Sequence, residues 1–206
     1  MLNLFLIAVV SYLIGSLSFA YLAGCLTGKD IRKFGSGNLG ATNVFRVLGV
    51  RAAVLVLAGD VLKGLAAVHI GFALGGAWAS WGAVLGGVAA MAGHNWPVFL
   101  RFRGGRGVAT GLGVVLYLMP GITVLAVAVF LVTIMLTRYV SAGSILAALS
   151  VLVLAWALPN PLPVRFFVLV GVPFVIFRHL PNIKRLLEGR ELRIGQTRPV
   201  EGQKKD

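Results

Sequence analysis

Successive apolar segments, each about as long as a bilayer-crossing helix, dominate this sequence and restrict the folds open to it. Of 206 residues, 58% are hydrophobic and 12% charged, and the mean hydropathy is +0.93. A soluble domain of this composition would expose large apolar patches and aggregate. A hydrocarbon core about 30 Å thick requires roughly 20 apolar residues of helix to cross it. The sequence therefore predicts an all-α, polytopic integral membrane protein.

We expect a single membrane domain over residues 1–206 with about seven transmembrane helices. Glycine, proline or charged residues separate the apolar segments. The first segment lacks the basic region of a signal peptide, so we interpret it as an uncleaved helix. Pro181 would begin a short helix lying in the headgroup region. The predicted spans are 2–26, 51–75, 77–93, 107–119, 121–137, 141–158 and 162–177, followed by a basic tail over 178–206.

The distribution of basic residues predicts the orientation of the chain. Seven spans would place the two ends of the chain on opposite sides of the membrane. Seventeen Lys and Arg residues then fall on one face, whereas Arg165 alone falls on the other. Because positive charge concentrates in cytoplasmic loops, we expect an outside N-terminus, a cytoplasmic C-terminus and cytoplasmic polar loops.

The net charge of +13 is consistent with three kinds of partner, namely nucleic acid, anionic lipid headgroups and small anions. The basic residues are confined to short loops and one tail of a very apolar chain, which argues against nucleic acid. A single cysteine, Cys25, cannot form an intrachain disulfide. The three histidines are scattered and carboxylates are few, so we expect neither a metal centre nor a cofactor.

The first polar loop contains a glycine-rich segment over residues 35–43. Glycines let several backbone N–H groups converge, and Ser36 and Thr42 add donors, which together suit an anion. An ordinary turn between two spans would also be rich in glycine, so both interpretations remain open here. The candidate phosphate-binding residues of this loop are Ser36, Gly37, Asn38, Gly40, Thr42, Asn43 and Arg46.

The second polar loop places Arg103 and Arg106 on either side of two glycines, directly before a predicted span. The N-terminus of that helix would offer free N–H groups and a positive dipole end, and arginine binds phosphate oxygens well. The excess of cytoplasmic positive charge explains the arginines but not the paired glycines, which favours a binding site. The candidates are His94, Arg103, Gly104, Gly105, Arg106, Gly107 and Thr110.

Two further groups of residues could bear on function. Arg178, His179 and Asn182 follow the last span, and His179 and Asn182 share a face if the segment is helical. A lone histidine at a membrane interface is more often structural than catalytic. Asp60 and Lys63 lie within the second span, where ionisable groups are usually paired or functional. For this pair, a structural ion pair and a role in lining the site both remain open.

Five motifs, in order along nearly the whole chain, resemble the PlsY family of bacterial acyl-phosphate:glycerol-3-phosphate acyltransferases. They are SGNLGATN at 36–43, DVLKG at 60–64, GHNWPVF at 93–99, GGRGVAT at 104–110 and RHLPNIKRL at 178–186. The His-x-x-x-x-Asp dyad of many other glycerolipid acyltransferases does not occur, because the fifth residue after each histidine is Leu74, Phe99 or Lys184.

The resemblance implies a compact seven-helix enzyme with its site at the cytoplasmic face of the bacterial inner membrane. It implies transfer of a fatty acyl group from long-chain acyl phosphate to the 1-hydroxyl of glycerol 3-phosphate. The products would be lysophosphatidic acid and phosphate, at the first acylation of phospholipid biosynthesis. An acyl-phosphate-producing enzyme would then be a functional partner. The implied catalytic residues are Ser36, Arg106, His179 and Asn182, with His179 or a donor phosphate oxygen receiving the proton.

Three positions depart from the common family pattern. Leu39 stands where many members have proline, and Arg103 and Arg106 stand where lysines are usual. Arginine does not readily release its proton, so its work at these positions would be electrostatic.

The competing class is a transporter or channel for an organic phosphate or another anion. Such carriers usually show two related halves and polar groups near the midplane, whereas these motifs gather on one face. A structural or assembly subunit would not need several anion-binding loops.

Overall fold

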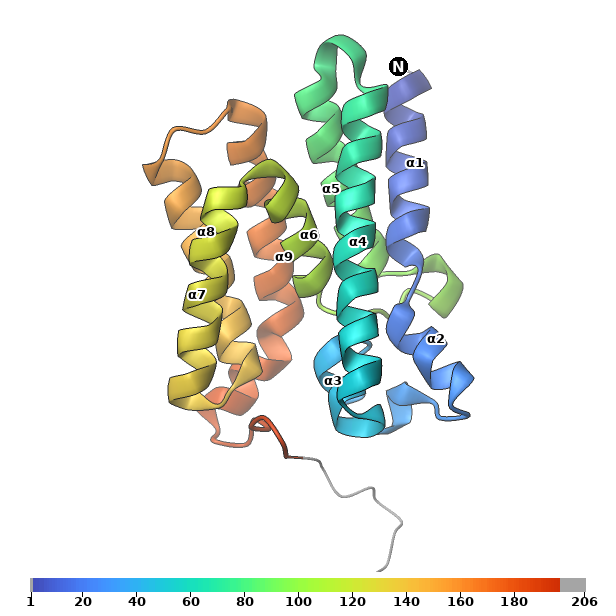
Figure 1. Cartoon of the computed structure of the whole chain (residues 1–206), viewed down its shortest axis with the longest axis vertical. Helices are drawn as coiled ribbons and strands as arrows, with labels where there is room; N and C mark the ends of the chain where they lie inside the picture. Colours follow the sequence, from blue (N-terminus) through green and yellow to red (C-terminus); the bar gives the residue numbers. More distant parts are fainter. Residues whose placement is uncertain (1, 197–206) are drawn as a thin grey trace, which may run out of the picture.

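The computed structural model describes residues 2–196, and every regular element within that range is helical (Figure 1). The prediction of an all-α polytopic membrane protein is confirmed. The α-helices are α1 Leu2–Ser16, α2 Phe19–Leu26, α3 Ala41–Leu48, α4 Val50–Leu74, α5 Ala79–Asn95, α6 Val108–Leu118, α7 Pro120–Thr137, α8 Val140–Ala157 and α9 Leu162–Leu187, with short 3-10 turns at Ile31–Lys33, Gly76–Trp78 and Val98–Leu100.

Six helical segments among the described residues are long and apolar enough to cross a bilayer. They are Leu2–Leu26, Val50–Leu74, Gly76–Leu100, Pro120–Thr137, Val140–Ala157 and Leu162–Leu187. The seventh expected span corresponds to α6, which has 11 residues and is therefore only about 16 Å long. The count of seven crossings and the orientation of the termini remain predictions.

The helices form two groups with α6 between them (Figure 1). In one group α4 packs against α1 and α5, and in the other α7 packs against α8 and α8 against α9. Small residues allow close helix contacts in the first group. A Cβ atom added to Gly15 on α1 would lie 2.1 Å from the carbonyl oxygen of Ala90 on α5, so this contact requires glycine.

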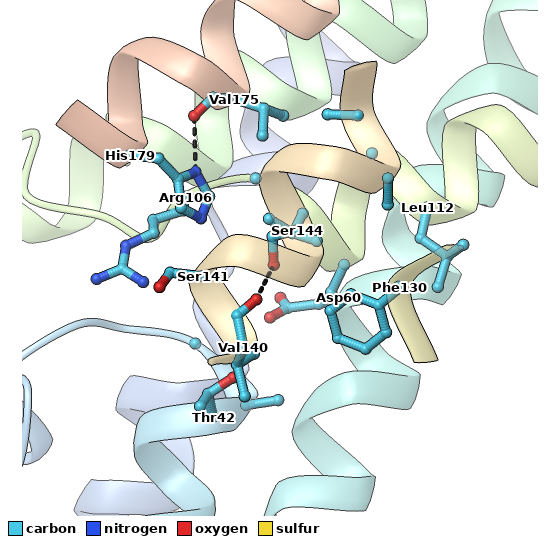
Figure 2. Close-up of a pocket in the computed structure, with 18 of the residues that line it drawn as sticks. Thr42, Asp60, Arg106, Leu112, Phe130, Val140, Ser141, Ser144, Val175 and His179 are labelled. Atoms are coloured by element: carbon cyan, nitrogen blue, oxygen red, sulfur yellow. Dashed lines mark hydrogen bonds between the residues drawn. The ribbon is translucent and has the colours of Figure 1, made fainter. Parts of the chain in front are cut away.

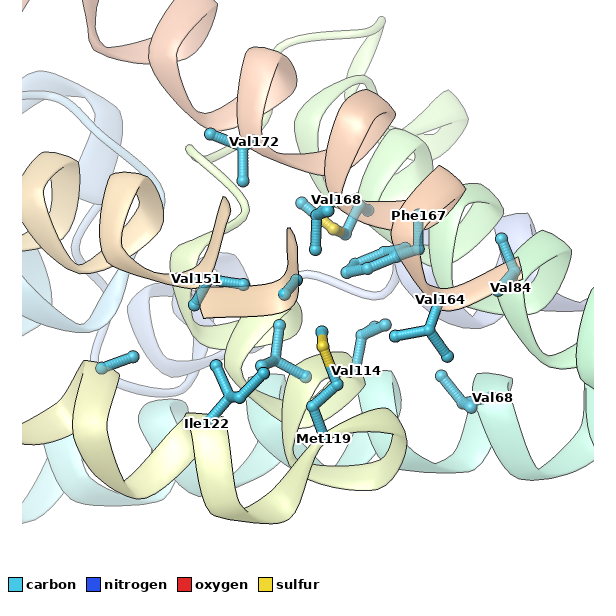
Figure 3. Packing of buried hydrophobic residues seen from close by; sticks show 14 of the residues in the cluster. Val68, Val84, Val114, Met119, Ile122, Val151, Val164, Phe167, Val168 and Val172 are labelled. Carbon is cyan, nitrogen blue, oxygen red and sulfur yellow. The ribbon is translucent and has the colours of Figure 1, made fainter. Parts of the chain in front are cut away.

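The main apolar core joins the two groups (Figure 3). Val114 of α6 and Val168 of α9 are fully buried in it, and Phe167 is 2% exposed. A smaller cluster, which includes Ile31, Leu39 and Val44, packs beneath α2 and α3. The second cluster fixes the first polar loop against α4, because Leu39 within the glycine-rich segment and Val44 directly after it belong to the same buried cluster as Val56 of α4.

The first predicted span, 2–26, is not one continuous helix. Helix α1 ends at Ser16 and α2 begins at Phe19. The Ser18 side chain accepts a hydrogen bond from the Tyr21 N–H at 3.3 Å, which is the contact of a helix N-cap. The predicted loop between the first two spans also contains a helix, α3.

The prediction of a separate headgroup helix beginning at Pro181 was wrong. Helix α9 continues from the last span to Leu187, with Pro173 and Pro181 inside it. Neighbouring helices can compensate for the hydrogen bond that an internal proline removes. His179 and Asn182 are both 1% exposed, so the continued helix is buried against the rest of the protein. Of the predicted basic tail, Arg198, Lys204 and Lys205 lie outside the described residues.

Candidate functional site

A cavity of about 440 Å³ lies between the two helix groups, with a polar end near α3 and an apolar lobe among α6, α7, α8 and α9 (Figure 2). The predicted site residues that line it are Ser36, Asn38, Gly40, Thr42, Arg46, Asp60, His94, Arg106, Gly107, His179 and Asn182. Residues from all five motifs therefore line one cavity.

Asn43 shapes the first loop rather than lining the cavity. Its side chain is 1% exposed. The Oδ1 atom accepts the Ser36 N–H at 2.8 Å, while Nδ2 donates to the carbonyl oxygens of Ile31 and Phe34 at 3.2 and 3.1 Å. Gly37 has a φ of +71°, which favours glycine. Asn43 thereby holds the loop in the conformation that presents Ser36 to the cavity.

Arg178 supports the second polar loop through hydrogen bonds to its backbone. Its Nε donates to the Gly105 carbonyl oxygen at 2.9 Å and its Nη2 to the Gly104 carbonyl oxygen at 3.0 Å. The Gly105 N–H donates to the His94 carbonyl oxygen at 3.0 Å. A Cβ added to Gly105 would lie 2.1 Å from His94 Nε2. The paired glycines thus allow the loop to lie directly on His94, and Arg178 is a positioning residue.

Arg106 lines the cavity just before α6 (Figure 2). Burial lowers the pKa of Arg106 to about 10, with Glu191 opposing the shift and nearby arginines adding to it. The guanidinium therefore stays protonated at neutral pH, as a fixed positive charge beside the N-terminus of a helix. Arg103, which the sequence also nominated, is exposed and lies outside the cavity lining.

His179 is held in one tautomer by its backbone contact. The Nδ1 atom lies 2.7 Å from the Val175 carbonyl oxygen (Figure 2). Because a carbonyl oxygen only accepts hydrogen bonds, Nδ1 must carry the proton. The neutral ring then has Nε2 as an acceptor. His179 is thus suited to accept a hydrogen bond or a proton in the cavity.

Asp60 and Lys63 form the ion pair that the sequence left open, and one of them also lines the cavity. Asp60 Oδ1 lies 2.7 Å from Lys63 Nζ and 3.5 Å from His94 Nδ1. Asp60 is among the cavity residues, whereas Lys63 is not. Thr110 is fully buried, and its carbonyl oxygen faces Gly64 of α4. Thr110 therefore packs between helices instead of facing the cavity.

The segment after α9 contributes residues that the sequence analysis missed. Glu191 Oε2 pairs with Arg185 Nε at 2.7 Å, and Glu191 Oε1 accepts from Asn182 Nδ2. Burial alone would raise the pKa of Glu191, but hydrogen bonds from Arg185 and Asn182 lower it overall. Arg185, Glu191 and Leu192 all line the cavity. Glu188 and Glu191, two carboxylates close together within a basic tail, were the signal that could have found this site.

The segment after α9 also makes hydrogen bonds to two other parts of the protein. Arg46 Nη2 donates to the Leu192 carbonyl oxygen at 3.4 Å, and the Ile194 N–H donates to the Arg138 carbonyl oxygen at 2.8 Å. The chain after α9 therefore crosses from α3 to the α7–α8 connection and borders the polar end of the cavity.

The fold and the cavity define a class of protein, a helical membrane protein with one cavity that joins a cationic end to an apolar lobe. The cationic end suits phosphate, and the adjoining lobe suits a hydrocarbon chain. Comparison with known proteins gives the particular family. The glycerol-3-phosphate acyltransferase family model matches residues 5–189. The chain belongs to this family, that of PlsY, and it is an acyltransferase.

The individual relatives agree over nearly the whole length. The glycerol-3-phosphate acyltransferase of Thermoanaerobacter pseudethanolicus is 47% identical over 196 residues, covering 95% of this chain and 98% of the relative. That of Synechococcus elongatus is 44% identical over 203 residues, covering 95% and 97%.

Two crystal structures of the integral membrane acyltransferase PlsY show the same fold. The glycerol 3-phosphate form has a TM-score of 0.87 and 39% identity, covering 93% of this chain and 96% of that one. The lysophosphatidic acid form has a TM-score of 0.85 and 38% identity, covering 93% and 95%. The resemblance found in the sequence is therefore confirmed, and the transporter interpretation is not retained.

Proposed function

We propose that this enzyme transfers a fatty acyl group from acyl phosphate to the 1-hydroxyl of glycerol 3-phosphate. The products are lysophosphatidic acid and phosphate, and the reaction is the first acylation in phospholipid biosynthesis. The observation that carries the proposal is one cavity with a cationic end and an apolar lobe. The PlsY structures in glycerol 3-phosphate and lysophosphatidic acid forms support the assignment of acceptor and product.

Both substrates carry phosphate, so the site must hold two anions close together. Arg46 and Arg106 supply positive charge at the polar end, and Ser36 and Thr42 add hydrogen-bonding groups. Fixed donors of this kind stabilise the charge that develops on the carbonyl oxygen and the departing phosphate. Acyl phosphate has a good leaving group, so positioning contributes more to the rate than activation of the nucleophile.

The reaction forms one bond and breaks another. The 1-hydroxyl oxygen bonds to the acyl carbonyl carbon, and the bond from that carbon to the phosphate oxygen breaks. The hydroxyl proton passes by way of His179 Nε2 to the departing phosphate. His179 Nε2 accepts a hydrogen bond from the hydroxyl and orients it, since Nδ1 is already committed to the Val175 carbonyl oxygen. Asn182, one turn further along α9, completes this side of the cavity.

The acyl chain occupies the apolar lobe, so the donor is bound within the membrane while its phosphate stays at the polar end. The seventeen-to-one distribution of basic residues favours a cytoplasmic location for that end, in the bacterial inner membrane. An enzyme that makes acyl phosphate must supply the donor from the same side.

The test is a donor comparison with the purified protein in detergent. Palmitoyl phosphate and glycerol 3-phosphate should yield lysophosphatidic acid and equimolar phosphate, whereas palmitoyl-CoA should not support turnover. His179→Gln should lose most activity. His69→Gln is the matched control, because His69 lies on α4 against Tyr117 and outside the cavity lining. Comparable turnover with palmitoyl-CoA, or no lysophosphatidic acid from palmitoyl phosphate, would contradict the proposal.

A further inference from the structure

The deep end of the apolar lobe is closed by side chains from four different helices. They are Val115 of α6, Thr123 of α7, Val151 of α8 and Phe167 of α9. Their exposed fractions are 9%, 4%, 6% and 2%. These residues line the cavity, and all but Thr123 also belong to the main apolar core (Figure 3). The lobe therefore ends inside the protein.

We infer that Phe167 forms the floor of this lobe and determines the longest acyl chain that fits within it. The inference rests on the proposed function, because it requires an acyl donor in the lobe. Phe167 has the largest side chain of the four closing residues. Its ring also lies along α9 toward the polar end, since a Cβ added to Gly171 would be 3.1 Å from Phe167 Cζ.

The depth of the lobe follows from helix geometry. Phe167 and His179 are twelve residues apart on α9, which corresponds to about 18 Å at a rise of about 1.5 Å per residue. On α8, Ser141 and Val151 both line the cavity and are ten residues apart, or about 15 Å. An extended alkyl chain advances about 1.3 Å per carbon, given C–C bonds of about 1.5 Å. The lobe thus accommodates roughly 12 to 14 carbons below the level of His179.

The sides of the lobe are more open near the polar end than at the floor. Leu57 of α4 and Leu131 of α7 line the cavity and are 43% and 52% exposed. Both lie within about three turns of the cytoplasmic ends expected for their helices. At the floor, in contrast, the four closing residues are at most 9% exposed. A chain can therefore enter sideways from lipid near the polar end, but its terminal part is enclosed and meets Phe167.

The experiment measures kcat/KM for saturated acyl phosphates of about 10 to 18 carbons with fixed glycerol 3-phosphate. Phe167→Ala should move the optimum to chains longer by about two to four carbons, the length of the ring removed, and Phe167→Leu should move it less in the same direction. Ala148→Phe should move the optimum to shorter chains, because Ala148 lines the lobe above Val151 on α8.

Phe166→Ala is the matched control. It removes the same ring from the neighbouring position, where Phe166 is 48% exposed and packs against Trp81 outside the cavity. Its chain-length profile should equal that of the unmodified enzyme. If Phe167→Ala does not fold, Phe167→Leu and Ala148→Phe decide the question. Unchanged profiles in these variants would overturn the inference while leaving the proposed function intact. Failure of the unmodified enzyme to use any acyl phosphate would instead overturn the proposed function.

Discussion

Lys63 Nζ donates a hydrogen bond to the carbonyl oxygen of Leu17 at 2.7 Å. Leu17 lies at the break between α1 and α2, where backbone carbonyls lose their helical partners. The same nitrogen lies 2.7 Å from Asp60 Oδ1, and Lys63 is 4% exposed. Lys63 therefore supplies a hydrogen-bond donor to the carbonyl oxygen at the break between α1 and α2. Its partner Asp60 also contacts His94, on which the second polar loop lies.

Lys63→Met should reduce the free energy of unfolding by about 3 kcal/mol or more, because it leaves Asp60 buried without its partner. Asp60→Asn combined with Lys63→Met should restore part of this loss, since no uncompensated charge then remains. Leu62→Met, on the 61% exposed neighbour, is the control and should be nearly neutral. Unfolding in detergent, followed by tryptophan fluorescence, provides the measurement. An equal or larger loss in the double variant would contradict the ion-pair explanation.

Acidification should destabilise the segment after α9 through Glu191. Burial opposes ionisation, but hydrogen bonds from Arg185 and Asn182 keep the pKa of Glu191 below its usual value. The folded state therefore favours the carboxylate, whose contribution is complete above the unfolded pKa and is lost as pH falls through the lowered folded pKa. Glu191→Gln should flatten this part of the pH dependence of unfolding, whereas Glu188→Gln should leave it unchanged. An identical pH profile for Glu191→Gln would show that this pairing contributes nothing.

The sequence predicts the fold well because lipid imposes lengths and hydropathy that can be read directly. One prediction was wrong because it applied to a membrane helix the rule that proline begins a helix in soluble proteins. Pro181 was interpreted as a helix start, yet α9 passes through it. The break at Leu17 was missed because neither Leu17 nor Ser18 is a typical helix breaker, and a long-range contact from Lys63 stabilises it.

The motifs also predict which loops meet, but not which side chains face the cavity. Asn43 and Arg178 sit within binding motifs, and both direct their donors to backbone carbonyls instead. Glu191 was missed because the tail was considered only as positive charge. Its position depends on the turn after α9, which brings a residue nine positions away back onto Asn182.

The orientation can be tested by cysteine labelling in a Cys25→Ser background, which removes the exposed native thiol. Lys33→Cys and Arg103→Cys should react only from the cytoplasmic side, and Ala77→Cys, in the α4–α5 connection, only from the outside. All three positions are exposed. Gly104 is unsuitable, because a Cβ there would lie 2.1 Å from the His94 carbonyl oxygen. Labelling of Lys33→Cys from outside would refute the predicted orientation.

Arg106→Ala should cost about 3 kcal/mol or more in kcat/KM, the scale of removing one transition-state donor. Arg106 combines a half-buried positive charge with the N-terminus of α6 at the polar end of the cavity. Arg106→Lys should recover much of the activity, because a lysine ammonium still reaches phosphate as a point charge.

Arg103→Ala shows whether activity depends on the charge inside the cavity or only on the total positive charge of the loop. Arg103 lies three residues from Arg106 on the same loop, but it is exposed and outside the cavity lining. Arg103→Ala should therefore lose far less activity than Arg106→Ala, and Arg51→Ala, at the exposed start of α4, should lose almost none. The measurement is kcat/KM for glycerol 3-phosphate, with folding checked by monodisperse extraction. If Arg106→Ala folded and kept full activity, the arginines would serve only to orient the loop in the membrane, and the phosphate site would have to be built from Arg46 and the first loop.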